Sequence, residues 1–375
     1  MERRELAGGD VDDPPAGGQL QPLARREQVL VERELGHIVE DSRLVIADAH
    51  VDLLLELAHR EHRLGEENVF ADTWLPLLRA GEVGLQICPV FVELELQPEG
   101  SLREALRQVA AFHRALRTHP DRLVAVRTRG DLDRVERGER TGLLLALEGV
   151  EPFGYEVATA DVFWELGLRM AGLTWNRRNP FADGAAEEGG LSRLGRSLLA
   201  RLAELGVVLD LAHASPQLYA ECLETYAGRL CVTHAGCRAV NDTPRNLSDE
   251  QLRELAARDG IFGLMLHPLA IDPQRPTIGR VIDHLDHAAS VLGPDRVCLA
   301  GDWIQRLHGL LRAPAPPDSL MPPGLEEGTT IEGLAGPEDY PALVEALRTR
   351  GWEGERLEGL LAANLIRFLR EALPD

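Results

Sequence analysis

Short apolar runs, each ending in a residue that can bind a metal ion, constrain the fold of this chain most. They read LVIADAH, LLLALEG, VVLDLAH, LCVTH and VCLAGD. Continuous apolar runs of this length are typical of strands buried on both faces of a parallel sheet. Because the carboxyl ends of parallel strands meet at one edge, side chains far apart in the chain can share one site there.

The residues at these ends are three histidines and three carboxylates: His50, Asp52, Glu148, His213, His234 and Asp302. Each has a simpler structural explanation, since a histidine can be a satisfied core residue and an aspartate can cap the next helix. All six at strand ends together favour a common site. Imidazole and carboxylate ligands without a thiolate suit two divalent metal ions, zinc above all.

Strand-like and helix-like segments alternate from Leu44 onward. Eight strands are predicted at 44–49, 84–92, 143–148, 168–174, 206–212, 230–234, 260–266 and 296–301. Intervening stretches such as IGRVIDHLDHAASVL have apolar residues three and four apart, which predicts helices. The pattern predicts an α/β fold, a (β/α)8 TIM-type barrel with a binuclear metal site at the C-terminal ends of the strands. An open doubly wound sheet is the alternative, but no GxGxxG follows the first strand.

Composition divides the chain into a tail and one domain. Residues 1–43 are rich in Gly, Pro, Asp, Glu and Arg without sustained periodicity, which predicts a disordered N-terminal extension. Residues 44–375 are expected to form a single barrel domain. The Pro- and Gly-rich stretch LLRAPAPPDSLMPPGLEEGTT, residues 310–330, predicts a long loop at the mouth of the barrel.

Charge and hydropathy exclude several classes of partner. The formal net charge of −21 disfavours nucleic acid, which requires a basic face. No apolar stretch has the length that spans a membrane, and the sequence MERRELAGGDVDD lacks the apolar core of a signal peptide. A cytoplasmic location without a membrane partner is therefore expected. The five cysteines have no CxxC spacing and are odd in number, which indicates buried apolar residues rather than disulfides or a thiolate zinc site.

The chain contains no lysine, so all forty basic residues are arginine. This absence excludes a Schiff-base mechanism, a phosphate-binding loop that depends on lysine, and a carbamylated lysine bridging two metal ions. Any group that bridges two metal ions must therefore be a carboxylate.

An ordered set of motifs resembles the membrane dipeptidase family, the renal dipeptidase-type or M19 metallopeptidases of the amidohydrolase superfamily. The motifs read DAHVD, ALEG, GLTWNRRNPFADG, LDLAHAS, VTHAGCRAVNDTPRN and LAGDW, and the resemblance runs from about Leu44 to the C-terminus. It implies that His50 and Asp52 bind one zinc ion, that Glu148 bridges both, and that His213 and His234 bind the second.

The same resemblance implies a zinc-dependent dipeptidase, a metallohydrolase that often forms homodimers. Its substrates are dipeptides or similar small amides with a free C-terminal carboxylate. The catalytic residues are then Asp302, which matches the acid/base aspartate, and Glu148, because two cations sharing one carboxylate can lower the pKa of a water held between them. Arg245 matches the arginine that holds the substrate carboxylate, for which a guanidinium is well shaped.

Two departures from the family pattern concern the substrate. Trp175 stands where many members have a histidine, and the family's DFDG becomes DWIQ at residues 302–305. Trp175 and the neighbouring Asn176 are expected at the substrate. These departures keep open another amidohydrolase activity, on a different amide, a lactam or an ester. A non-catalytic metal-binding protein on the same scaffold is a third hypothesis, and the complete ligand set argues against it.

Overall fold

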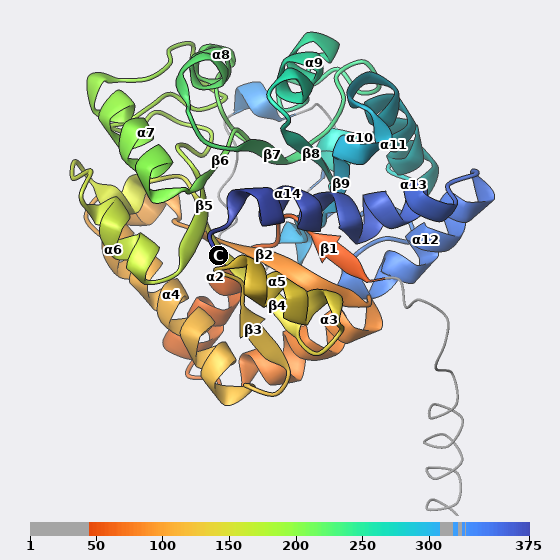
Figure 1. Cartoon of the computed structure of the whole chain (residues 1–375), viewed down its shortest axis with the longest axis horizontal. Coiled ribbons are helices and arrows are strands. Elements are labelled where there is room, and N and C mark those ends of the chain that lie inside the picture. The colour runs from red at the N-terminus through yellow and green to blue at the C-terminus, as the bar shows by residue number, and fades with distance from the viewer. Residues whose placement is uncertain (1–44, 308–317, 322–324, 327) are drawn as a thin grey trace, which may run out of the picture. The chain divides into compact units, whose positions relative to one another are not determined.

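A computed structural model describes residues 45–307, 318–321, 325–326 and 328–375 (Figure 1). Within them, parallel strands close into a ring that confirms the predicted barrel: β1 (Ile46–Asp48), β2 (Val83–Phe91), β4 (Thr141–Glu148), β5 (Leu168–Gly172), β6 (Val208–Asp210), β7 (Leu230–Ala235), β8 (Ile261–Met265) and β9 (Val297–Ala300). The ring is closed because β1 pairs with both β2 and β9, while β2 pairs with β4. The expectation for residues 1–43 lies outside the described residues.

Each of the eight predicted strands corresponds to one strand of the ring. One further strand, β3 (Leu123–Ala125), was not predicted from the sequence, and it pairs with the first residues of β4. It is only three residues long, and a polar stretch follows after Val126. So short a run gives no periodic signal.

Helices pack around the ring and across one end of it. They are α2 (Leu53–Ala58), α3 (Leu75–Ala80), α4 (Ser101–Thr118), α5 (Arg129–Glu136), α6 (Thr159–Glu165), α7 (Arg193–Leu205), α8 (Pro216–Thr225), α9 (Asp249–Ala257), α10 (Pro268–Ile271), α11 (Ile278–Leu292), α12 (Tyr340–Thr349), α13 (Gly354–Glu358) and α14 (Asn364–Ala372). Local sequence sets their ends. The side chain of Ser192 accepts a hydrogen bond from the Gly195 N–H at the start of α7, and Gly206 ends α7 with a left-handed φ of 69°.

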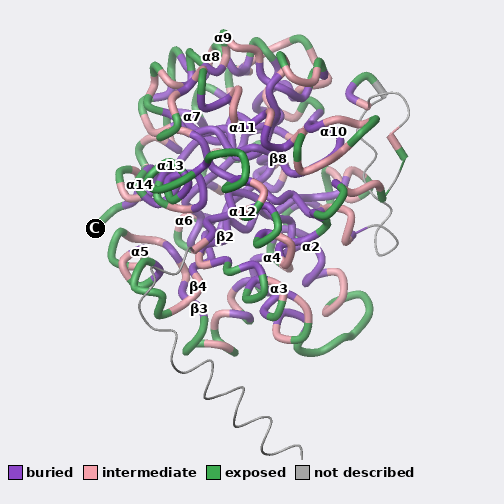
Figure 2. The backbone as a smooth tube through the Cα atoms, turned by 90° about the vertical axis from the view of Figure 1, so that its right-hand side faces the viewer, coloured by how far each residue is buried: buried purple, intermediate pink, exposed green. Residues whose placement is uncertain are grey.

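Buried residues gather in the interior of the molecule (Figure 2), and the apolar ones form two main layers. The larger layer fills the space between the strands and the surrounding helices. The smaller layer lies inside the ring, where side chains such as Leu85, Met170 and Ile261 pack together. The C-terminal helix α14 adds Phe368 and Leu369 to this inner layer, and Figure 1 shows α14 lying across the ring. One end of the barrel is therefore closed by apolar packing.

All five cysteines are free and buried, as the sequence predicts: Cys88, Cys222, Cys231, Cys237 and Cys298. No helix among the described residues is long and apolar enough to cross a membrane.

Candidate metal centre and substrate cavity

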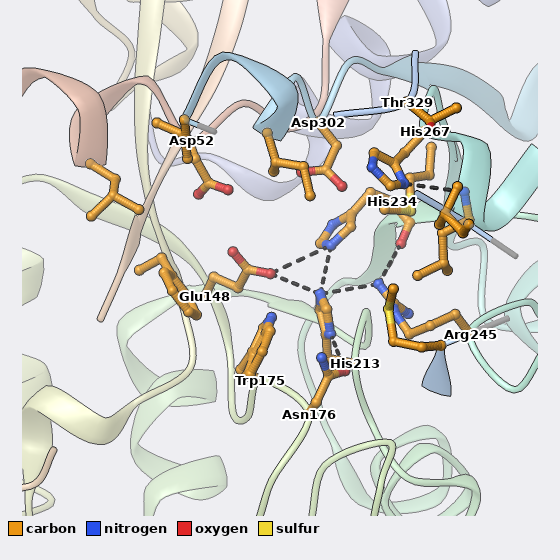
Figure 3. A pocket seen from close by; sticks show the side chains of 18 of the residues that line it. Asp52, Glu148, Trp175, Asn176, His213, His234, Arg245, His267, Asp302 and Thr329 are labelled. Carbon is orange, nitrogen blue, oxygen red and sulfur yellow. Dashed lines mark hydrogen bonds and ion pairs between the residues drawn. The ribbon is translucent and has the colours of Figure 1, made fainter. Parts of the chain in front are cut away.

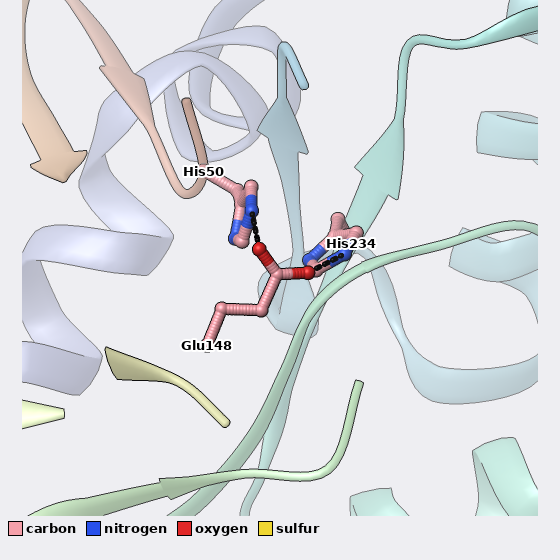
Figure 4. A group of neighbouring side chains, drawn as sticks. All are labelled: His50, Glu148 and His234. Carbon is pink, nitrogen blue, oxygen red and sulfur yellow. Dashed lines mark ion pairs between the residues drawn. The ribbon is translucent and has the colours of Figure 1, made fainter. Parts of the chain in front are cut away.

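The six residues expected at strand ends come together at the carboxyl end of the ring; Figure 3 shows five of them, and Figure 4 shows the sixth, His50. His50 and Asp52 follow β1, Glu148 is the last residue of β4, and His234 lies in β7. His213 follows β6 and Asp302 follows β9. None is exposed by more than 9%. Five strands of the ring therefore carry one buried polar cluster.

Glu148 lies at the centre of this cluster, and Figure 4 shows its two oxygens directed at different histidines. Its Oε2 is 3.4 Å from the Nε2 of His50. Its Oε1 is 2.8 Å from the Nε2 of His213 and 3.5 Å from the Nε2 of His234. A carboxylate placed in this way can serve two neighbouring cations, one on each oxygen.

Asp52 and Asp302 complete the side of the cluster that contains His50. Ligand atoms of these three residues all lie within 4.8 Å of one another. The Nε2 of His50 and the Oδ1 of Asp52 are buried without a hydrogen-bond partner in the described structure. Buried polar atoms without a hydrogen-bond partner are costly, so their presence in one cluster fits a role as metal ligands.

The other ring nitrogens of the histidines are fixed by hydrogen bonds. The Nδ1 of His213 lies 2.7 Å from Oδ1 of Asn176, and the Nδ1 of His234 lies 2.9 Å from Oγ1 of Thr233. The Thr233 hydroxyl donates to Asp210, so it accepts from His234. Both imidazoles then carry their proton on Nδ1, which leaves Nε2 unprotonated, the form in which it can bind a metal ion. Asn176, expected at the substrate, thus also orients a histidine.

Charges in the cluster are unbalanced toward the negative. Burial alone would lower the pKa of His50, but the charge and hydrogen bond of Glu148, together with the charges of Asp52 and Asp302, outweigh burial and raise that pKa to about 10. Burial and the positive charge of Arg245 lower the pKa of His213 to about 4. Burial, reinforced by Glu148, raises the pKa of Asp302 to about 6. A buried group of three carboxylates that raises the pKa of a histidine favours bound cations.

Two of the cluster residues have left-handed backbone conformations that are unfavourable for a side chain with a Cβ atom. His213 has a φ of 62° and Asp302 a φ of 44°. Such conformations cost free energy and persist where the surroundings enforce them, which is common at functional sites. Here the turn after each strand directs the side chain toward the cluster.

Arg245 lies beside the metal-type cluster and is 6% exposed. Its Nη2 is 3.0 Å from the Nε2 of His213, and it donates to the carbonyl oxygen of His234 over 3.3 Å. It makes no ion pair with a carboxylate of the described residues. A buried guanidinium normally requires an anionic partner.

A cavity of about 320 Å³ opens over the cluster. Trp175, Asn176 and Arg245 line it, as do described residues of the segment 310–330, among them Met321 and Thr329. For the described residues of the segment, this agrees with the prediction of a loop at the mouth. Apolar side chains make up much of the remaining wall.

One residue of the cavity wall was missed from the sequence. His267 follows β8 at the end of the run IFGLMLH, and it lines the cavity near Thr329 in Figure 3. Its Nδ1 accepts a hydrogen bond of 3.2 Å from the N–H of Leu269. The signal was the same as for the other histidines, a polar residue closing an apolar strand.

Fold and site together define a metal-dependent hydrolase, with its chemistry at the carboxyl ends of the strands of a closed barrel. The chain belongs to the membrane dipeptidase family, peptidase family M19, whose sequence model matches residues 34–313.

Curated relatives and solved structures resemble the chain over most of its length. Dipeptidase 3 of Mus musculus is 28% identical over 360 residues, which cover 92% of this chain and 66% of that protein. Dipeptidase aclJ of Aspergillus oryzae is 26% identical over 350 residues, 88% of this chain and 78% of that protein. The chain thus spans about two thirds of the mouse protein.

Two solved metallopeptidase structures resemble this chain. The crystal structure of dipeptidase AC, of family M19, superposes with a TM-score of 0.77 at 22% identity and covers 89% of this chain and all of that one. A metallopeptidase from Rhodobacter sphaeroides, solved with a phosphinate mimic of the dipeptide L-Ala-D-Ala, gives a TM-score of 0.76 at 22% identity. It covers 88% of this chain and 100% of the other. At this level of identity the resemblance concerns the fold.

Proposed function

We propose that the protein is a zinc-dependent dipeptidase that hydrolyses the peptide bond of dipeptides with a free C-terminal carboxylate. The observation that carries the proposal is a buried guanidinium, that of Arg245, 3.0 Å from a histidine of the cluster and without a carboxylate partner among the described residues. The carboxylate of a short peptide would supply that partner and place the peptide bond over the cluster. Family membership and the relatives named dipeptidase support the same activity.

Two divalent ions fit the donor set. His50, Asp52 and one oxygen of Glu148 would hold the first, and the other oxygen with His213 and His234 would hold the second. Bound there, the ions would polarise the substrate carbonyl and lower the pKa of a water. Zinc is the expected metal because imidazole and carboxylate ligands in a compact, buried site suit it.

Asp302 is the group proposed to move the proton. It is 4% exposed and lines the cavity. One of its carboxylate oxygens lies within 4.8 Å of a ligand atom of His50 and of Asp52. Its carboxylate can accept a proton from the attacking water and give it to the leaving amine. Arg245 would hold the C-terminal carboxylate of the substrate, which keeps the peptide bond beside Asp302 and the proposed metal site.

The test compares Arg245→Ala with the wild type on a dipeptide and on the same dipeptide amidated at its C-terminus. Loss of a two-pronged charged contact should cost about 1.5–3 kcal/mol, roughly ten- to hundredfold in kcat/KM for the acid. The amide should be a poor substrate for the wild type and should lose little more in the variant. Equal cleavage of acid and amide by the wild type would contradict the proposal.

Another amidohydrolase activity is the second candidate. Trp175 lies with its ring centroid 6.0 Å from that of His213, where a polar donor to the scissile group would be expected in the family. Activity on an amide, lactam or ester without a free carboxylate, insensitive to Arg245→Ala, would favour this candidate.

We also propose a cytoplasmic location. The supporting observation is that all five cysteines are free, because oxidising compartments favour disulfides. Fractionation of the native host cell would test it.

A further inference from the structure

The cavity has two chemically different ends. Arg245 lies on the side of His213 and His234, to whose atoms it is hydrogen bonded. Asp52 lies on the opposite side of Glu148, and Figure 3 shows Asp52 and Arg245 on opposite sides of the glutamate and histidine cluster. A molecule that spans the cavity therefore meets a cation at one end and the residues around Asp52 at the other.

The end near Asp52 carries an apolar cluster separate from the two core layers. It consists of Leu55, Phe91 and Leu307, exposed by 2%, 3% and 7%, with Trp175 packed against them. Leu55 is in α2 directly after Asp52, and Phe91 ends β2. The rings of Phe91 and Trp175 lie 5.3 Å apart in an edge-to-face arrangement. All four side chains line the cavity.

A dipeptide fits this layout in one direction. The Nη2 of Arg245 is 3.0 Å from the Nε2 of His213, which is 2.8 Å from the Oε1 of Glu148. Two residues of extended chain span at most about 7 Å, so a dipeptide whose carboxylate is bound to Arg245 can place its peptide carbonyl beside Glu148. The first residue of the dipeptide then lies beyond Glu148, on the side of Asp52. Its side chain would enter the apolar cluster, whereas the second residue would lie against a mixed wall, with polar groups such as His267 and Thr329 beside apolar side chains such as Met265.

We infer that Leu55, Phe91, Trp175 and Leu307 form the pocket for the side chain of the first residue, and that the enzyme selects dipeptides whose first residue is large and apolar. This inference rests on the proposed dipeptidase function. Trp175 is the specificity-determining member because it is the only one of the four that is not fully buried, and it lies between Phe91 and His213. An apolar pocket discriminates between a leucine and an alanine side chain by roughly ten- to hundredfold in kcat/KM.

The first experiment uses the wild-type chain, reconstituted with zinc, on Leu-Ala, Ala-Leu and Ala-Ala. The expected result is that Leu-Ala exceeds Ala-Ala at least tenfold in kcat/KM and also exceeds Ala-Leu. Equal rates on Leu-Ala and Ala-Ala overturn the inference while leaving the dipeptidase function intact. A preference for Ala-Leu overturns the assigned direction. No hydrolysis of any of the three refutes the proposed function itself, and with it this inference.

The second experiment compares Trp175→Ala with the matched control Tyr155→Ala. Tyr155 is an aromatic residue that is 75% exposed and does not line the cavity, so the control should keep the wild-type ratio of Leu-Ala to Ala-Ala. In Trp175→Ala that ratio should fall about tenfold. A ratio equal to that of the control removes Trp175 from the pocket. If Trp175→Ala does not fold, as judged by circular dichroism, Trp175→His repeats the test with the residue expected in the family.

Discussion

At the scale of single residues, histidines of the metal-type cluster are themselves held by a buried hydrogen-bond network of Thr233 and Asp210. Asp210 is the last residue of β6, within the run VVLDLAH, and is buried. Its carboxylate accepts hydrogen bonds from the Thr233 hydroxyl and from the backbone N–H groups of Ala212 and Thr233. Thr233 in turn contacts His234 and, at 3.4 Å, the Nδ1 of His50. One carboxylate therefore orients, through one hydroxyl, histidines on both sides of Glu148.

Removal of the Thr233 hydroxyl should weaken metal binding without removing any ligand. Thr233→Val keeps the shape of the side chain but leaves the Nδ1 proton of His234 without its acceptor. The expected loss is about ten- to hundredfold in metal affinity, measured by competition with a chromophoric chelator. Thr225→Val is the matched control, because the Thr225 hydroxyl bonds the carbonyl oxygen of Glu221 on exposed surface. Equal affinity in both variants would contradict this role of Thr233.

The number of ions can be read from two substitutions in the cluster. Because the oxygens of Glu148 face histidines of both proposed sites, Glu148→Gln should release more metal than His234→Ala, which leaves the His50 and Asp52 site intact. The wild type should carry two divalent ions per chain by elemental analysis after zinc loading. At most one ion in the wild type would refute a binuclear centre, and the same single-ion loss in both variants would argue against a bridging Glu148.

At the scale of secondary-structure elements, a buried histidine connects three segments near the site. The Nδ1 of His284, in α11, accepts a hydrogen bond from the N–H of Cys237. Its Nε2 lies 2.9 Å from the carbonyl oxygen of Ile271, at the end of α10. The backbone donor requires Nδ1 to be unprotonated, so the ring is held neutral. Burial is the main cause that lowers its pKa from 6.5 to about 4.

This histidine should make folding stability depend on pH. The folded pKa lies below the unfolded one, so the unfolded chain binds a proton first as the pH falls. The stabilisation is complete above pH 6.5 and is lost between 6.5 and about 4, at most about 3 kcal/mol. His284→Gln, which does not titrate, should lose correspondingly less stability between pH 7 and pH 4.5 in urea unfolding. An unchanged pH dependence in the variant, with or without a chelator present, would contradict the assignment.

The comparison of sequence and structure shows which elements a pattern can specify. The eight ring strands were predictable because a strand buried on both faces needs a continuous apolar run, and the same logic located the residues that follow them. β3 was not predictable, because a strand of three residues that pairs only with the start of β4 is too short to show a periodic pattern. His267, which follows β8, gave the same sequence signal as the proposed metal ligands. The sequence does not show that this histidine lines the cavity instead of joining the metal-type cluster. Asn176 was expected at the substrate, yet its contact with His213 depends on a turn that no local pattern specifies.

At the scale of the whole molecule, one end of the ring is open to the cavity and the other is closed by α14. Leu369 of α14 is fully buried in the inner layer of the core. Its backbone carbonyl also accepts the N–H of Leu373, which ends the helix. The last helix therefore belongs to the barrel core, although it lies more than sixty residues beyond the last ring strand.

Shortening the Leu369 side chain of α14 should destabilise the entire barrel. Leu369→Ala should lower the free energy of unfolding by about 2–5 kcal/mol, because the lost side chain leaves a cavity in a close-packed layer. Leu106→Ala on α4 is the matched control, since Leu106 is 41% exposed and its loss should stay within about 0.5 kcal/mol. Urea titration of both variants measures the difference. Similar small losses in the two would show that α14 is not part of the core.

The five buried thiols give the molecule built-in reporters of how it opens. Cys231 and Cys298 belong to the layer inside the ring, whereas Cys88, Cys222 and Cys237 belong to the layer between strands and helices. A thiol reagent reaches each group only when its layer loosens. The order of alkylation, resolved by mass spectrometry during mild denaturation, therefore distinguishes detachment of the outer helices from rupture of the ring.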